Sequence, residues 1–167
     1  SYVDLQSEMV AIIKNFNQSG SLLLNGDSTD INIKTDVEAL TFVMAGDKLA
    51  NKIKFKSDVK IAADLEKMIF DFKENQFRLN DLKLGIDGRL EMPDDMIFDL
   101  TLSAKDNKFE DLLSLIPMIY KKDVEGIDVK GDFSLFAALK GNMNNESLPG
   151  FDVKFSINDG YIKYPDL

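Results

Sequence analysis

The sequence alternates apolar and polar residues over long stretches, and this period of two constrains the fold more than any other feature. The clearest stretch is 151–157, where alternate positions are occupied by Phe151, Val153, Phe155 and Ile157. Three further stretches, 52–61, 84–92 and 96–103, show the same pattern. Side chains of a β-strand point alternately to opposite faces, so each stretch predicts a strand with one buried and one wet face. This pattern is typical of antiparallel sheets and predicts a mainly β fold.

Weaker alternation predicts further strands at 10–16, 21–25, 31–44, 68–72, 76–79, 129–139 and 161–164. Residues that favour turns separate them at 19–20, 25–27, 74–75, 93–95 and 158–160. A change of phase between Leu79 and Leu82 predicts a bulge or tight corner near Asp81. Connections this short favour antiparallel pairing of neighbouring strands. We therefore expect one module over residues 1–167, a strongly curved antiparallel meander that forms either a β-groove or an open sandwich.

One segment departs from the period of two and predicts a short helix around 108–117. Its apolar residues fall on one helical stripe, and we expect all four to dock on the apolar side of the sheet: Phe109, Leu112, Leu113 and Ile116. Asn107 is the expected N-cap, with Glu110 three residues later. Pro117 disfavours a helical conformation at Ile116, so the helix should end there.

The sequence also repeats a short phrase. Residues 68–71 recur as 96–99, and each copy is followed by a similar segment that favours a turn, 73–75 and 105–107. Either the chain contains a weak internal repeat, or two strands experience similar local constraints.

Composition excludes several classes of chemistry. The 167 residues contain no His, Cys or Trp, which removes thiol nucleophiles, Ser-His-Asp relays and zinc sites built on nitrogen or sulfur. The net charge of −9 disfavours nucleic-acid binding, and the lysines of 52–60 are read as the wet face of one strand. Neither a phosphate-binding glycine loop nor an EF-hand pattern occurs. The carboxylate pair Asp94-Asp95 follows a proline at a predicted turn, where acids are ordinarily solvated. We expect no enzyme activity, no cofactor and no metal.

No stretch of the sequence approaches the ~20 apolar residues that a membrane-spanning helix needs. The first residues lack the basic and apolar regions of a signal peptide, and the chain begins without Met. We expect an excised interior fragment of a longer protein, with any anchor or signal outside it.

The amount of one-faced apolar strand is the main positive observation, because only one short helix is available to cover the sheet. The apolar positions of the stronger strands and of 129–139 are Ile53, Phe55, Val59, Ile61, Leu84, Ile86, Leu90, Phe98, Leu100, Leu102, Phe133, Leu135, Phe151, Val153, Phe155 and Ile157. These faces either pack against each other in a closed core or line an open groove. The alternation pattern is compatible with both arrangements.

Several phrases in the second half, in this order and spacing, resemble the AsmA-like family of Gram-negative bacteria, in particular the form found in Bacteroidetes. The phrases are 72–80, 84–88, 92–95, 109–117 with Tyr120, 148–151, 158–160 and 164–167. The resemblance covers 64–167, and the earlier part fits more loosely at 39–42 and 48–51.

The resemblance implies a relative of TamB and of the bridge-like lipid transfer proteins. Such proteins are anchored in the inner membrane by an N-terminal helix and extend a long β-groove into the periplasm. Their expected role is to carry phospholipid towards the outer membrane or to support envelope assembly, without catalytic residues. The expected partners are phospholipid acyl chains along the sixteen apolar positions above, and flanking β modules of the same parent chain. Membrane contact would occur only through other parts of that parent.

Two other functions remain open at this point. A structural or protein-interaction domain with a closed core and no lipid path would need the same apolar faces to be fully packed. A hydrolase with two carboxylates would need two acids brought into one cleft, and no local motif places them there.

Overall fold

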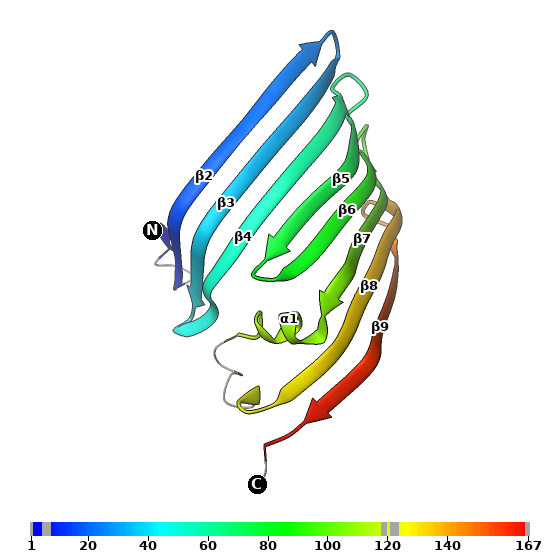
Figure 1. The fold of residues 1–167 in the computed structure, drawn as a ribbon. Helices are drawn as coiled ribbons and strands as arrows, with labels where there is room; N and C mark the ends of the chain where they lie inside the picture. The colour runs from blue at the N-terminus through cyan, green and yellow to red at the C-terminus, as the bar shows by residue number, and fades with distance from the viewer. Residues whose placement is uncertain (1, 5–7, 118–119, 121–123, 166–167) are drawn as a thin grey trace.

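The computed structural model describes residues 2–4, 8–117, 120 and 124–165, and these residues form one antiparallel sheet with one short helix (Figure 1). In chain order the elements are β1 (Tyr2–Asp4), β2 (Met9–Asn25), β3 (Ser28–Met44), β4 (Asp47–Asp64), β5 (Ile69–Leu79), β6 (Leu82–Glu91), β7 (Met96–Lys108), α1 (Phe109–Leu113), β8 (Asp128–Met143) and β9 (Gly150–Lys163). The spatial order of the strands equals their chain order. The predicted mainly β fold, a curved antiparallel meander with one short helix, is confirmed.

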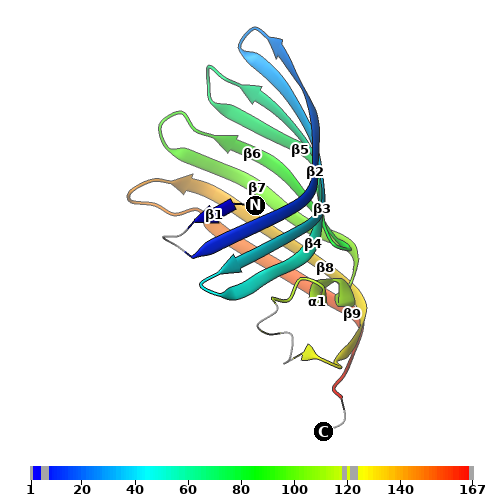
Figure 2. The ribbon, with the colours of Figure 1, turned by 90° about the vertical axis from the view of Figure 1, so that its left-hand side faces the viewer.

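The sheet is open and consists of a single layer in the part of the chain that the structure describes. At one edge β1 pairs with residues 9–11 of β2, and at the other edge β9 pairs only with β8. The N-terminus lies at the first edge and the C-terminus at the second (Figure 1). Figure 2 shows the strands bending along their length, with α1 on the inner side of the bend. The single curved sheet is therefore observed, rather than two facing sheets.

The strands are longer than the sequence predicts, because three expected turns lie inside them. β2 runs through 19–20, β5 through 74–75 and β9 through 158–160, so these three turn predictions were wrong. Two of the sites are β-bulges: Glu74 has a φ of 55° and Asp159 one of 52°, and the pairing register shifts beside both. These two bulges use the same left-handed backbone as many turns, so bulge and turn are hard to distinguish here in the sequence.

Gly20 has a different role inside β2. A Cβ at this position would lie 2.6 Å from the carbonyl oxygen of Asn32 on β3, so only glycine permits the close approach of the two strands. The remaining turn predictions agree with the structure. Turns occur at Gly26 and Asp27, at residues 93–95 and at the tight corner of Asn80 and Asp81.

Each copy of the repeated phrase is followed by a β-bulge rather than by a turn, and the two bulges are equivalent. Asn75 on β5 and Asn107 on β7 each follow a residue with a φ of 55°, and each is only 1% exposed. The Oδ1 atom of Asn75 accepts a hydrogen bond from the backbone N–H of Lys60 on β4. In the same way Asn107 Oδ1 accepts from the N–H of Lys83 on β6, at 2.7 Å. The two strands therefore meet similar local constraints, each bonding back to the preceding strand.

Helix α1 is shorter than expected and begins one residue later. Lys108 is the N-cap, and its backbone N–H donates to the Oδ2 atom of Asp111 at 2.8 Å. The predicted cap of Asn107 with Glu110 was wrong, because Asn107 is buried in its bulge. The regular helix ends at Leu113 rather than at Ile116, and the chain continues in turns to residue 116.

Candidate functional site

The strand register places the sixteen predicted apolar residues on one side of the sheet, which we call the apolar face. Residues directly opposite each other in neighbouring strands share a face. Ile86 lies opposite Leu102, Leu102 opposite Ala137, and Ala137 opposite Val153, so one row crosses four strands. A second row joins Ile61 to Phe72 and passes through Gly88 to Leu100, Leu139 and Phe151. The other residues of the sixteen share this face, because each lies at an alternate position of one of these strands or directly opposite a residue of one of the two rows.

The apolar face extends beyond the residues that the sequence singled out. On β5 it includes Phe70, Phe72 and Phe77, and on the strands before it Ile31, Ile33 and Leu22. The β5 residues were missed because the bulge at Glu74 shifts the alternation by one position between Phe72 and Phe77. The sequence signal for these residues is two alternating segments separated by the polar run 73–76, with the alternation shifted by one position across that run.

The apolar face is covered unequally. Near the β9 edge Phe151 is 73% exposed and Phe155 is 71% exposed, whereas the apolar residues of β5 and β6 are half-buried or buried. Large apolar side chains of β2, among them Leu22 and Leu24, are also exposed. Contiguous exposed apolar surface of this kind commonly marks a site for a partner, a membrane or an apolar ligand.

Helix α1 covers the apolar face near the β5–β6 turn. Phe109 and Leu112 pack against a buried cluster of Leu82, Ala104 and Phe133, which come from β6, β7 and β8. Asn80, in the β5–β6 turn, donates from Nδ2 to the carbonyl oxygen of Ser114 at 3.2 Å. The helix is therefore held both by apolar packing and by a polar contact.

The other two predicted docking residues face a cavity. Leu113 and Ile116 line a space of about 710 Å³ between the α1 segment and β4, opposite Leu49 and Ile53. Val124 and Leu115 complete its apolar wall. Of the four residues predicted to dock, two thus pack on the sheet and two form the wall of a pocket.

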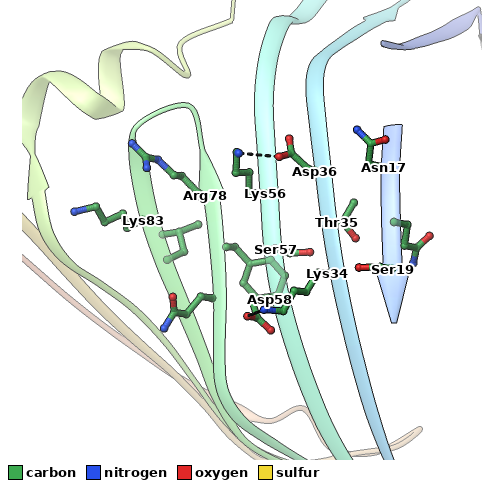
Figure 3. Close-up of a pocket in the computed structure, with 14 residues that line it drawn as sticks. Asn17, Ser19, Lys34, Thr35, Asp36, Lys56, Ser57, Asp58, Arg78 and Lys83 are labelled. Atoms are coloured by element: carbon green, nitrogen blue, oxygen red, sulfur yellow. Dashed lines mark ion pairs between the residues drawn. The ribbon is translucent and has the colours of Figure 1, made fainter. Parts of the chain in front are cut away.

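The opposite side of the sheet, the polar face, carries cross-strand ion pairs. Lys56 Nζ lies 2.7 Å from Asp36 Oδ2, and Lys34 Nζ lies 3.0 Å from Asp58 Oδ2. These side chains surround a hollow of about 610 Å³ over β2–β6 (Figure 3). Of the lysines in 52–60, Lys60 also lies within ion-pair distance of Glu74. The polar face is thus a solvated surface whose lysines are largely paired with carboxylates of neighbouring strands.

Arg89 and Asp71 make a bidentate ion pair on the polar face. Arg89 donates from Nε and Nη2 to the two carboxylate oxygens of Asp71, at 2.7 and 3.0 Å. These hydrogen bonds, together with the positive charge of Arg89, hold the pKa of the Asp71 carboxyl below its ordinary value. This shift has a structural cause, and the pair lines an open hollow of about 810 Å³ on the polar face.

The carboxylates of the described chain are dispersed. Asp95 is exposed in the β6–β7 turn, where its Oδ2 accepts from Asn144 Nδ2 at 2.8 Å. Glu110 and Asp111 lie in the first turn of α1. Within the described ranges no group of three or more Asp or Glu side chains is arranged to hold a metal ion. The apolar face is therefore the feature on which a functional argument can rest.

No helix of the described residues is both long and apolar enough to span a membrane. Comparison of the chain with protein-family models, with curated proteins and with solved structures finds no match.

Proposed function

We propose that this chain is a periplasmic module of the AsmA-like type that holds phospholipid acyl chains along its apolar face. The observation that carries the proposal is the continuity of that face across the long strands, with exposed phenylalanines at the β9 edge. In this role the module would support assembly of the outer membrane by holding or conducting lipid. The proposal assigns it no catalytic residue, cofactor or metal.

The dimensions of the apolar face suit an acyl chain. β3 has 17 residues and β4 has 18, so each spans roughly 55 Å at ~3.3 Å per residue. Burying one methylene group contributes ~0.8 kcal/mol, so a chain lying along part of this length gains substantial free energy without polar recognition.

The chemistry of the face predicts weak headgroup selectivity. Its lining residues are aliphatic and aromatic, while the lysines and arginines of the ion pairs lie on the polar face. Phosphate recognition ordinarily uses charge-assisted hydrogen bonds from such cations. We therefore expect lipids with different headgroups to bind similarly.

The partners follow from the two free edges. β9 at one edge and most of β2 at the other present unpaired backbone groups, and such edges pair readily with further strands. We propose that flanking β modules of the same parent chain extend the sheet there. The parent would be anchored in the inner membrane through a part outside residues 1–167.

Photocrosslinking at matched positions tests the lipid path. A photoreactive residue is placed at Phe98 or Phe155 on the apolar face, or at Lys54 or Lys154 on the polar face, and each protein is incubated with phospholipid vesicles. The proposal predicts labelled phospholipid at the two phenylalanine positions and little at the two lysine positions. Equal labelling of both faces, or labelling of neither, would contradict it and favour a structural or protein-interaction domain without a lipid path.

A further inference from the structure

The cavity beside α1 combines an apolar wall with a position on the apolar face. Two hollows on the opposite side, of about 610 and 810 Å³, are lined largely by ion-paired basic and acidic side chains. By contrast, the cavity beside α1 is walled by Leu49 and Ile53 of β4 and by Leu113, Leu115 and Ile116 of the α1 segment. Its volume of about 710 Å³ is within the usual range of ligand pockets.

This cavity is continuous with the apolar face. Ile53 belongs to both, and two positions further along β4 Phe55 lies opposite Leu79 of β5. Phe55 and Phe77 have ring centroids 6.5 Å apart, so the aromatic surface of β4 and β5 begins directly beside the cavity. A chain lying along the apolar face can therefore reach the cavity without crossing a polar surface.

The α1 segment closes the apolar face at this end. Phe109 and Leu112 fix the helix to the sheet, which leaves Leu113 and Ile116 directed at the cavity as a wall. The hydrogen bonds from Asn80 Nδ2 to the carbonyl oxygen and Oγ of Ser114, at 3.2 and 3.3 Å, tie the end of the helix to the β5–β6 turn. The described chain contains no such helix at the opposite ends of the strands, where the hairpins project separately (Figure 2).

The charges of the described lining residues disfavour an anionic headgroup in the cavity. The ionisable residues among its described lining residues are Glu110 and Glu125, and none of these described residues is a lysine or arginine. A phosphate or carboxylate headgroup would meet two like charges and would lose its hydration without gaining a cationic partner. An uncharged hydrocarbon end meets neither penalty.

From these observations we infer that the cavity beside α1 receives the methyl end of a single acyl chain, so that α1 acts as an end stop and fixes the direction in which a bound lipid lies. This inference rests on the proposed function, because it presupposes a chain on the apolar face. It adds a specific pocket, an orientation and a role for α1.

The absence of tryptophan from the sequence makes a direct test possible, because a single introduced Trp is the only indole in the protein. Leu49→Trp and Ile116→Trp report on two walls of the cavity, and Phe98→Trp reports on the apolar face away from it. Each protein is titrated with stearic acid that carries bromine either on the terminal carbon or next to the carboxylate, since bromine quenches indole emission only at close range. Circular dichroism checks that each variant keeps its strand content, and two cavity reporters guard against the failure of one.

The expected result is that the terminally brominated acid quenches most of the emission of both cavity reporters, while the acid brominated next to the carboxylate leaves it nearly unchanged. Quenching of Phe98→Trp without quenching of the cavity reporters would overturn this inference and leave the proposed function standing. Equal quenching of the cavity reporters by both acids would overturn the orientation. If no reporter is quenched, the proposed function fails and the end stop fails with it.

Discussion

Two phenylalanines of the apolar face, Phe133 on β8 and Phe155 on the neighbouring β9, have very different surroundings. Phe133 on β8 is 8% exposed, because it has strands on both sides and lies in the cluster that packs under α1. Phe155 on β9 is 71% exposed, because its strand is at the edge and no described residue covers it. Both belong to the same alternating pattern in the sequence. Alternation therefore determines the face on which a side chain lies, while its position in the sheet and the presence of α1 above it determine how deeply it is buried.

The largest effect should come from truncating these two residues in parallel. We expect Phe133→Ala to lower the free energy of unfolding by ~3–5 kcal/mol, because it opens a cavity in the cluster under α1. The same truncation at Phe155 should cost about 0.5 kcal/mol, the usual range for an exposed position. Urea denaturation of both variants measures the difference. Similar losses at the two positions would mean that Phe155 is covered in solution, for example by a second chain at the β9 edge.

A smaller effect should distinguish the two buried asparagines. Asn107 accepts from the N–H of Lys83 and donates to the carbonyls of Lys83 and Lys105, so Asn107→Ala leaves several backbone groups without a partner. Asn75 accepts from Lys60, but its Nδ2 has no partner among the described residues. Leaving a buried polar group unsatisfied costs ~1–3 kcal/mol. We expect Asn107→Ala to lower the free energy of unfolding by ~2–3 kcal/mol and Asn75→Ala to lower it by ~1 kcal/mol. Urea denaturation measures both losses. A larger loss for Asn75→Ala than for Asn107→Ala would contradict this account of the bulges.

Much of the fold could be predicted because each strand of an antiparallel sheet with one apolar face shows that face as alternation in its own sequence. The alternation in 52–61 and 151–157 defines strands and faces without any knowledge of their partners. The position of the sixteen apolar residues on a common face follows from the same period, once the strands pair in chain order. Helix α1 was recognisable from its stripe of apolar residues, because residues three positions apart lie on opposite sides of a strand but on the same side of a helix.

The remaining features depend on contacts between strands that a single sequence does not reveal. Residues 74–75 and 158–160 favour a left-handed backbone, and only the register shows that the chain uses it in a bulge rather than in a reversal. Asn107 was misassigned as a helix cap because its actual partner, the backbone of Lys83, lies 24 residues away. The cavity beside α1 was not predictable either, since its walls come from β4 and from the segment around Leu113, far apart in the chain.

The smallest effect is expected on the polar face, where the ion pair of Asp71 and Arg89 provides the contrast to the apolar face. Because Arg89 lowers the folded-state pKa of Asp71, the unfolded chain binds this proton at a higher pH than the folded chain does. The stabilisation is therefore fully present above the unfolded pKa of ~3.9 and is lost as the pH falls through the lower folded value. Asp71→Asn should be less stable than the unmodified protein at neutral pH, by less than Asn107→Ala, since Arg89 is half exposed to solvent. The gap should close in acid, when urea denaturation is repeated at decreasing pH.

Adding Arg89→Gln to Asp71→Asn provides the control, because the second substitution should have little further effect once the pair is broken. A stability gap that does not change with pH would show that Asp71 contributes through packing rather than through its charge.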